Sequence, residues 1–422
     1  MSICEVERAV LVSIAESSAK MRECELGLAE LERLLNTAGA EAFCKVIQIK
    51  DSFDPRTCIG KGKVAEISEI CKANDIGLVV FDFELTPAQI RNLEDDIGDV
   101  RVIDRSMLIL DIFALHATSG EGKLQVELAQ LKYSAPRLVG HGTELSRQGG
   151  GIGSRGPGES KLETDRRHMR ERISALEERL RELEHNRMVM RSKRDRSGIA
   201  KIGIVGYTNA GKSTLLNALT DAGVLSEDKL FATLDATTRK SILPNGETVL
   251  FTDTVGFIKN LPHHLVKAFK STLDEVIYSD LLLIVADASD SEAEREVEVT
   301  ESVIEELGAA DKPRIYVFNK CDAIDLSDVP EKEGTVFISA KTGEGIDLLL
   351  NRISIELSRL KREYTLLFPY DSQSSLNSLY KTYSVLDAEY LAEGVSVKAI
   401  LDDKGRGIYS SYIVAEGGDS NG

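Results

Sequence analysis

The sequence predicts an α/β protein whose main domain is a doubly wound, mostly parallel sheet. A small α/β domain and a helical hairpin precede this domain, and a short C-terminal α+β appendix follows it. From residue 198 onward, strongly apolar strands alternate with helices, as a parallel sheet covered on both faces requires. Residues 1–120 show the same alternation on a smaller scale. Between them, a seven-residue apolar repeat predicts a long helix that pairs with another.

Length and composition predict a soluble protein of several domains. The chain has 422 residues, more than one hydrophobic core usually holds, and it is 42% hydrophobic and 29% charged. The longest apolar run covers only residues 281–286, whereas a membrane helix needs roughly 20. The acidic N-terminus does not resemble a signal peptide, and six scattered cysteines without a CxxC pair favour a reducing compartment. We therefore expect a cytoplasmic protein without a membrane partner.

The first domain is expected to span residues 1–120. Its predicted strands cover residues 9–14, 44–49 and 77–83. Its predicted helices cover residues 21–35 and 63–73, and residues 100–103 and 108–113 form further elements of unassigned type. This order predicts a small parallel sheet.

Residues 121–197 are expected to form a helical hairpin with a basic tip. The apolar repeat in its second helix consists of Leu162, Met169, Ile173, Leu176, Leu180, Leu183 and Met190. The shorter pattern of Leu124, Leu128 and Leu131 is the candidate antiparallel partner. Between the two helices, a glycine-rich loop carries Arg147 and Arg155, and residues 132–201 have a net charge of +7 in a chain of net charge −17. A solvated linker with a charged helix is the alternative interpretation.

The main domain is expected at residues 198–361 and the C-terminal α+β domain at residues 362–422. Predicted strands of the main domain cover residues 199–205, 248–252, 281–286, 314–318 and 335–338. Predicted helices cover residues 212–220, 264–278, 292–307 and 346–360. In the C-terminal domain we expect a strand, a helix over residues 374–392 and two further strands.

The segment GYTNAGKS at residues 206–213 matches the P-loop pattern GxxxxGK[ST] between a predicted strand and a predicted helix. Its glycines allow backbone N–H groups to wrap phosphates at the start of the helix. Lys212 is expected to reach the β- and γ-phosphates as a catalytic group, and Ser213 is expected to bind Mg²⁺. The nucleotide-binding residues of this segment are Gly206, Tyr207, Thr208, Asn209, Ala210, Gly211, Lys212, Ser213 and Thr214.

A second phosphate element, DTVG, follows the strand at 248–252. Asp253 is placed to hold Mg²⁺ through water, and the backbone N–H of Gly256 is placed to contact the γ-phosphate, so Gly256 is a catalytic candidate. Thr254 and Val255 lie between them.

The segment NKCD resembles the base-recognition element of the P-loop GTPases, in which the aspartate accepts hydrogen bonds from guanine. Its residues are Asn319, Lys320, Cys321 and Asp322. Ser339, Ala340 and Lys341 resemble the last base-contacting loop of the same enzymes. Because adenine lacks this pair of donors, such a site discriminates strongly between the purines.

The segment between the P-loop and Asp253 should contain the switch that senses the γ-phosphate. Thr233 is the favoured catalytic and Mg²⁺ ligand, while Thr237 and Thr238 remain open. The nucleotide-binding residues expected here are Phe231, Ala232, Thr233, Leu234 and Asp235.

Two departures from the Ras-like pattern bear on the rate of hydrolysis. Phe257 occupies the position of a glutamine that orients the attacking water, which predicts slow intrinsic hydrolysis and a need for an activator. Asn209 resembles a residue of the potassium-stimulated GTPases, which implies K⁺ as a second candidate cofactor beside Mg²⁺.

Longer stretches of the chain resemble the HflX family of ribosome-associated P-loop GTPases. They include RVIDRSMLILDIFALHA at 101–117, EGKLQVELAQLKY at 121–133, GGGIGSRGPGESKL at 149–162, GYTNAGKSTLL at 206–216 and FATLDATTR at 231–239. The resemblance implies GTP hydrolysis to GDP and phosphate and binding to the large ribosomal subunit, its rRNA and proteins, with a role in splitting or rescuing ribosomes. The basic hairpin tip, Arg147 and Arg155, is independently suited to rRNA phosphates.

Two alternatives remain open for the function. One is a ribosome-assembly GTPase, and the other is a nucleotide-switched RNA-binding module with negligible turnover. A monomer is expected, although the apolar seam of the hairpin can pair within or between chains.

Overall fold

A computed structural model describes residues 6–137, 157–195, 199–220, 231, 237–258, 270–324 and 334–416. The chain divides into two compact units, which we treat separately. The first holds Met1–Leu183, Glu227–Asp235 and Asn260–Lys270, and the second holds Glu184–Ser226, Ala236–Lys259 and Ser271–Gly422. Within the described ranges, no helix is long and apolar enough to span a bilayer.

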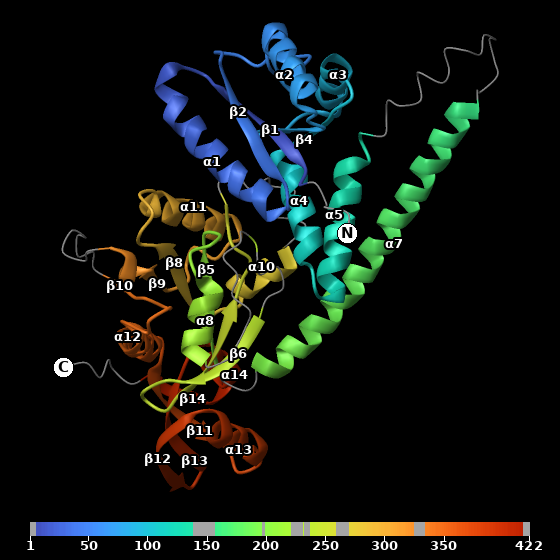
Figure 1. The fold of residues 1–422 in the computed structure, drawn as a ribbon. Helices are drawn as coiled ribbons and strands as arrows, with labels where there is room; N and C mark the ends of the chain where they lie inside the picture. Colours follow the sequence, from blue (N-terminus) through green and yellow to red (C-terminus); the bar gives the residue numbers. More distant parts are fainter. Residues whose placement is uncertain are drawn as a thin grey trace, which may run out of the picture. The chain divides into compact units, whose positions relative to one another are not determined.

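The first unit contains a parallel sheet with the strand order β2-β1-β3-β4 (Figure 1). Its strands are β1 (Arg8–Ala15), β2 (Glu41–Ile49), β3 (Leu78–Phe81) and β4 (Arg101–Asp104). Its helices are α1 (Met21–Thr37), α2 (Lys61–Asn74), α3 (Pro87–Ile97) and α4 (Arg105–His116), and a 3₁₀ turn, η1 (Ser18–Lys20), precedes α1. The predicted alternation is confirmed, and the unassigned element at 108–113 is the middle of α4.

Helices cover both faces of this sheet. Leu28, Leu31 and Leu35 of α1 are fully buried at helical spacing, and α1 contacts β1 and β2. On the opposite face, Val10 and Val12 of β1 pack into a cluster with side chains of α2 and α3. Because both faces are covered, all four residues of β3 are buried, as the apolar sequence predicts.

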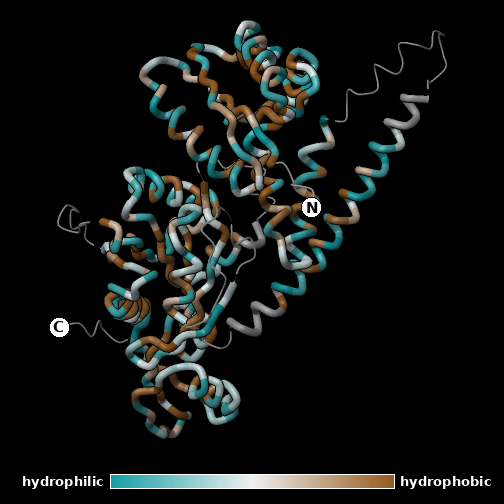
Figure 2. Tube along the Cα trace, viewed as in Figure 1, coloured by the Kyte–Doolittle hydropathy of each residue, from teal (hydrophilic) through white to brown (hydrophobic). Residues whose placement is uncertain are grey.

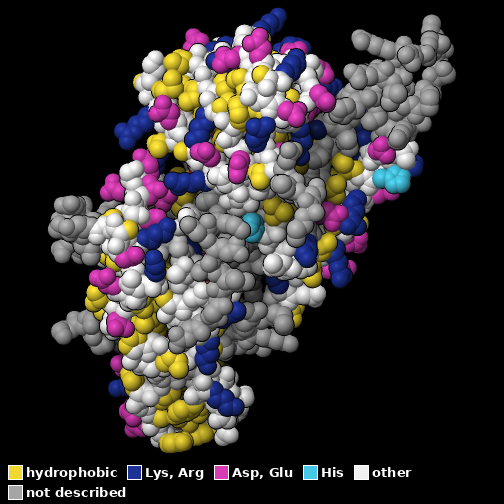
Figure 3. Space-filling view, in the orientation of Figure 1, with side chains coloured by type: hydrophobic (Ala, Val, Ile, Leu, Met, Phe, Trp, Pro, Cys, Tyr) yellow, Lys and Arg dark blue, Asp and Glu magenta, His cyan; other side chains and the backbone are white. Residues whose placement is uncertain are grey.

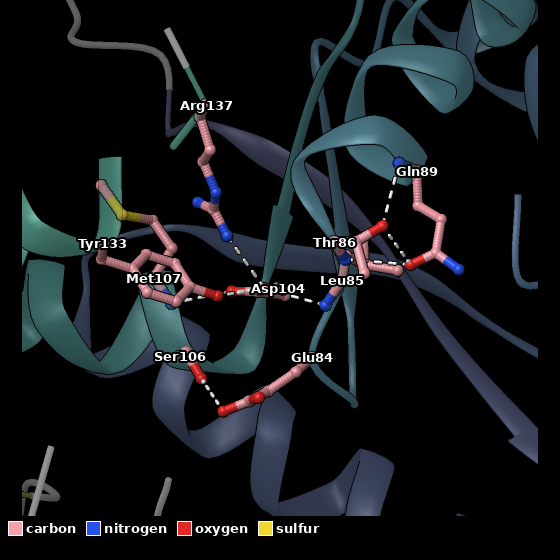
Figure 4. Close-up of polar contacts among 9 residues, drawn as sticks. All are labelled: Glu84, Leu85, Thr86, Gln89, Asp104, Ser106, Met107, Tyr133 and Arg137. Atoms are coloured by element: carbon pink, nitrogen blue, oxygen red, sulfur yellow. Dashed lines mark hydrogen bonds and ion pairs between the residues drawn. The ribbon is translucent and has the colours of Figure 1, made fainter. Parts of the chain in front are cut away.

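Asp104 joins three elements of this unit at the end of β4 (Figure 4). Its side chain caps α4 by accepting a hydrogen bond from the Met107 backbone N–H at 3.0 Å, and it accepts a second from the Leu85 N–H at 3.1 Å. Beyond α5 (Gly120–Ser134), Arg137 pairs with Asp104 at 3.1 Å, and the Tyr133 hydroxyl donates to it. The Arg137 guanidinium lies 3.8 Å from the Tyr133 ring centroid. The chain is therefore anchored immediately before residue 138.

The hairpin helices are α5 and α7 (Pro157–Asp195), of which α7 belongs to the first unit up to Leu183. Arg172 of α7 pairs with Glu127 of α5 at 2.7 Å, and Lys132 of α5 pairs with Glu177 of α7 at 2.7 Å. The described members of the apolar repeat on α7 are less exposed than their neighbours, and Leu176 is buried, whereas the buried residues of α5 are Gly122, Gln125, Val126 and Ala129 rather than the predicted leucines. Elsewhere α7 presents mixed charges to solvent (Figure 3). The tip residues Arg147 and Arg155 lie outside the described ranges.

The second unit contains a six-stranded sheet with the order β10-β9-β8-β5-β7-β6. Its strands are β5 (Ala200–Gly206), β6 (Thr237–Ile242), β7 (Thr248–Asp253), β8 (Leu281–Asp287), β9 (Arg314–Asn319) and β10 (Thr335–Phe337). All neighbours are parallel except β6 and β7. Strands β5, β7, β8, β9 and β10 match the five predicted strands, whereas β6 was not predicted. Figure 2 shows the hydrophobic residues of these strands.

Helices flank this sheet as a doubly wound fold requires. They are α8 (Lys212–Thr220), α10 (Lys270–Ile277), α11 (Ala293–Glu306) and α12 (Ile346–Arg359). Leu215 and Leu216 of α8 and Leu349 and Ile353 of α12 pack with alternate strand residues in one core cluster. Helix α11 contacts β8 and β5. The described part of the predicted helix 264–278 is α10, and residues 259–269 lie outside the description.

A four-stranded antiparallel sheet, ordered β12-β13-β11-β14, ends the chain. Its elements are β11 (Arg362–Phe368), α13 (Gln373–Thr382), β12 (Ser384–Leu391), β13 (Gly394–Leu401), α14 (Asp403–Ile408), η4 (Ser410–Tyr412) and β14 (Ile413–Glu416). The prediction of a helix over residues 374–392 was wrong beyond Thr382. Residues 384–391 pair with β13 across a tight turn at Gly394, whose φ is +156°. Pairing across this hairpin outweighs the helical propensity of its sequence.

Lys404 of α14 fixes this domain to the main sheet through an ion pair with Asp280 at 2.6 Å. Hydrophobic side chains gather over the C-terminal sheet in Figure 3, where Leu386 and Tyr390 of β12 are 55% and 79% exposed.

Candidate functional site

The P-loop connects β5 to α8 and folds as its glycines require. Gly206 has φ +152°, and a Cβ there would lie 2.1 Å from the backbone oxygen of Val285. Gly211 has φ +88°, and its Cβ would lie 2.2 Å from Asn319 Nδ2. Asn209 adopts the left-handed region at φ +62°. A side chain at either glycine would displace a neighbour, so this loop shape depends on glycine at both positions.

Lys212 and Ser213 begin α8 and face the end of β7. Lys212 is 7% exposed, and its Nζ donates to the Tyr207 carbonyl oxygen at 2.7 Å. Burial lowers the pKa of Lys212 to about 8, although the Asp253 carboxylate opposes this shift. A bound polyphosphate supplies the negative charge that favours the protonated amine.

Ser213 and Asp253, two of the expected metal ligands, lie together. The Ser213 hydroxyl donates to Asp253 Oδ2 at 2.6 Å, and Asp253 is fully buried. Oxygen ligands of this kind suit Mg²⁺, which usually binds one or two protein groups together with phosphate oxygens and water. Among the described residues no group of three or more His, Cys, Asp or Glu side chains forms a separate metal site. The residues present therefore fit a nucleotide-bound magnesium ion.

The segment after Asp253 packs against the P-loop. Thr254 is buried, and its hydroxyl donates to the Ile204 carbonyl oxygen at 2.8 Å. A Cβ on Gly256 would lie 2.8 Å from Lys212 Nζ and 2.9 Å from Thr208 Cα, so a side chain has no room there. Phe257 is 1% exposed, and its ring belongs to the protein interior. This residue therefore offers no polar group to an attacking water.

Asn319 ties the base-recognition element to the P-loop. Its Nδ2 donates to the Ala210 carbonyl oxygen at 2.9 Å, and its Oδ1 accepts from the Ala340 N–H at 2.9 Å. Asn319 thus links the base-recognition element and the loop at residues 339–341 to the P-loop. Sequence spacing predicts that Asn319 lies near the site but does not reveal this bridging role.

Asp322 is exposed and is oriented by its neighbours. Its Oδ1 accepts from the buried Ser339 hydroxyl at 2.7 Å. Lys320 has φ +66° and pairs with Asp287, at the end of β8, at 2.6 Å, and Lys341 is exposed beside the same loop. Cys321 is buried, and its N–H donates to the Ile338 carbonyl oxygen at 3.1 Å. The Asp322 carboxylate is therefore held at the surface, where a purine can reach it.

The candidate switch threonines separate into two groups. Thr233 lies outside the described residues, as do Ala232, Leu234 and Asp235. Thr237 and Thr238 belong to β6, where Thr237 lies opposite Asp253 in the sheet and Thr238 Oγ1 is 3.0 Å from Thr252 Oγ1.

Phe231 belongs to the first unit rather than to the unit that holds the P-loop. It is 2% exposed with φ +57°, and its ring packs edge-on against Phe113 of α4 at a centroid distance of 4.7 Å. The sequence gives no signal for this contact between residues 118 positions apart.

Known proteins match this chain over most of its length. Family models match residues 25–114 as "GTP-binding GTPase N-terminal", 116–194 as "GTP-binding GTPase Middle Region" and 201–320 as "50S ribosome-binding GTPase". The chain is 51% identical over 394 residues to "GTPase HflX" of Caldanaerobacter subterraneus subsp. tengcongensis, covering 93% of this chain and 90% of that protein. It is 44% identical over 398 residues to "GTPase HflX" of Escherichia coli, covering 93% and 92%.

A solved structure of a GTP-binding protein from Sulfolobus solfataricus in complex with GDP is 25% identical. The match covers 84% of this chain and all of that one, with a TM-score of 0.43. The P-loop in its α/β setting, the three family models and the identity to the two HflX proteins over nearly the whole chain show that the protein is a P-loop GTPase of the HflX family.

Proposed function

We propose that this GTPase hydrolyses GTP at the carboxyl edge of its main sheet and that the nucleotide controls binding to the large ribosomal subunit. The observation that carries the first part is the convergence of Lys212, Ser213, Asp253 and Gly256 at one end of β5 and β7. The second part is supported by the basic segment at residues 132–201 and by the name of the matching family model, "50S ribosome-binding GTPase".

In the proposed reaction, water attacks the γ-phosphorus in line as its bond to the β-phosphate oxygen breaks, giving GDP and phosphate. Lys212 and the backbone N–H groups of the P-loop and Gly256 stabilise the charge that develops on the phosphoryl oxygens. Ser213, Thr233 and, through water, Asp253 would hold a magnesium ion, which would supply positive charge to the β- and γ-phosphates. Guanine is identified by the Asp322 carboxylate, while the loop at residues 339–341 lies along the base.

We further propose that a K⁺ ion binds beside Asn209. The left-handed backbone of this residue turns the loop at the point where it wraps the phosphates. A monovalent cation there would place positive charge near the transferring phosphoryl group, which other GTPases obtain from an arginine.

The buried ring of Phe257 supports slow intrinsic hydrolysis that a partner accelerates. We expect isolated large ribosomal subunits to raise the single-turnover rate by roughly 100-fold or more, because activators of other GTPases contribute at least this much. The measurement is hydrolysis of bound GTP with large subunits, with small subunits as the control. Equal, slow rates with large subunits, with small subunits and without subunits would instead support the binding module with negligible turnover.

The basic segment is proposed to contact rRNA in the cytoplasm, where ribosomes are found. The first residues of this segment are held in place, because the Tyr133 hydroxyl donates a hydrogen bond to Asp104 and Arg137 forms an ion pair with it (Figure 4). A GTPase that acts in ribosome assembly would use the same contacts with rRNA. Binding to immature large subunits would distinguish this role from ribosome splitting.

Charge reversal at Arg147 and Arg155 is expected to weaken binding to large subunits by roughly 10-fold or more at physiological salt, because two phosphate contacts become repulsive. The affinity for GTP should not change. Sedimentation with purified subunits and calorimetry with GTP are the two measurements. Arg359→Glu with Arg406→Glu, on exposed positions of the second unit, makes the same change in net charge and serves as the control. Equal losses of subunit and GTP binding in the tip variant would contradict the assignment.

A further inference from the structure

Thr208, the third residue of the P-loop, carries a hydroxyl that the fold leaves unpaired. The residue is 5% exposed, and its Oγ1 has no hydrogen-bond partner among the residues that the structure describes. Buried hydroxyl groups almost always find a partner, so an unpaired one inside a ligand site indicates that the ligand supplies it.

The backbone holds this side chain in place. The Thr208 N–H donates to the Phe257 carbonyl oxygen at 2.7 Å, and the Phe257 N–H donates to the Gly206 carbonyl oxygen at 3.0 Å. These two bonds join the P-loop to the segment that follows Asp253. Threonine is also stiff about χ1 because it is branched at Cβ. A change in the loop that exposed the hydroxyl by moving the Thr208 backbone would have to break these bonds.

Groups that bind phosphate surround the same point. A Cβ built on Gly256 would lie 2.9 Å from Thr208 Cγ2 and 2.8 Å from Lys212 Nζ. The Thr208 methyl group, the Lys212 ammonium and the backbone of Gly256 thus lie around one small volume, and the Thr208 hydroxyl is attached to the same Cβ as that methyl group. Two of these groups carry donors directed to the γ-phosphate in the proposed reaction. A hydroxyl that donates a hydrogen bond needs an acceptor, and the oxygens of a terminal phosphoryl group are acceptors.

We propose that the Thr208 hydroxyl donates a hydrogen bond to the γ-phosphoryl group of GTP. It thereby reads the terminal phosphate directly, and it adds a neutral donor in a site where Phe257 supplies none. This inference deepens the proposed nucleotide site and rests on it. GDP lacks the group that Thr208 contacts, so the hydroxyl contributes to the preference for the triphosphate.

The test compares Thr208→Val, which keeps the shape without the hydroxyl, with Thr208→Ser, which keeps the hydroxyl. Calorimetry measures the Kd of a non-hydrolysable GTP analogue and of GDP, and a single-turnover assay measures hydrolysis. The valine variant should bind the analogue roughly 10- to 100-fold more weakly, the range expected for a hydrogen bond to a charged group. Its GDP affinity should stay within about twofold, and the serine variant should bind both nucleotides like the unmodified protein.

Thermal unfolding of the nucleotide-free proteins distinguishes a purely structural role. Because the hydroxyl has no described partner, Thr208→Val should unfold at the same temperature as the unmodified protein or a higher one. A lower Tm for this variant would overturn the proposal, as would equal losses of GDP and analogue affinity, or unchanged analogue affinity. Failure of the unmodified protein to bind either nucleotide would instead contradict the nucleotide site itself.

Discussion

Replacement of Lys212 by alanine is expected to lower the single-turnover rate of GTP hydrolysis by roughly 100- to 1000-fold, the usual cost of removing one donor that stabilises transition-state charge. The reason lies in its position, since Lys212 is 7% exposed and its ammonium lies near the Tyr207 carbonyl, the Gly256 backbone and the Asp253 carboxylate. Water cannot replace a cation in so enclosed a site.

The control for this prediction is Lys240→Ala, which removes an exposed lysine of β6 from the same unit. Its rate should match that of the unmodified protein. Circular dichroism of both variants establishes that they are folded. A Lys212→Ala protein that is folded and keeps its hydrolysis rate would show that the reaction takes place elsewhere.

Asp322→Asn is expected to weaken GTP binding by roughly 1000-fold and to favour xanthosine triphosphate. The carboxylate accepts hydrogen bonds from the ring N–H and the amine of guanine. An asparagine amide presents one donor to the guanine amine, and two donors then face each other without an acceptor. Xanthine carries an oxygen at that position, so it pairs with the asparagine side chain.

Competition binding with the two triphosphates measures this exchange of preference. Asp347→Asn, at an exposed position on the first turn of α12, is the matched control and should leave the preference for GTP intact. The Oδ1 atom of asparagine can accept the Ser339 hydrogen bond as the Asp322 carboxylate does. The loop at residues 339–341 is therefore not expected to rearrange. If the variant still prefers GTP, Asp322 does not read the base.

Local sequence patterns were sufficient to predict most of the elements that position this site. The P-loop glycines, the apolar strands on either side of β5 and the motif spacing each depend on short-range constraints that are visible in the sequence. Strand β6 was not predicted, because TTRKSI contains one apolar residue and this edge strand is stabilised by pairing with β7. The error at residues 374–392 has the same origin in pairing with β13.

Contacts between distant residues could not be predicted in this way. Arg105 is 4% exposed and pairs with Glu30 at 2.5 Å and Asp82 at 2.7 Å, although its sequence context is that of an ordinary helix start. The packing of Phe231 on Phe113 and the unpaired Thr208 hydroxyl likewise depend on the assembled structure. Sequence identifies which residues can bind phosphate, whereas the fold determines which polar groups remain for the ligand.

Calorimetric titration of the unmodified protein with GTP and with ATP, in the presence of Mg²⁺, tests the central claim most directly. A triphosphate on the amides before α8 with its purine at Asp322 predicts that GTP binds at least about 1000-fold more tightly than ATP, because adenine leaves the carboxylate without its two donors. Equal affinities for the two nucleotides would contradict the account.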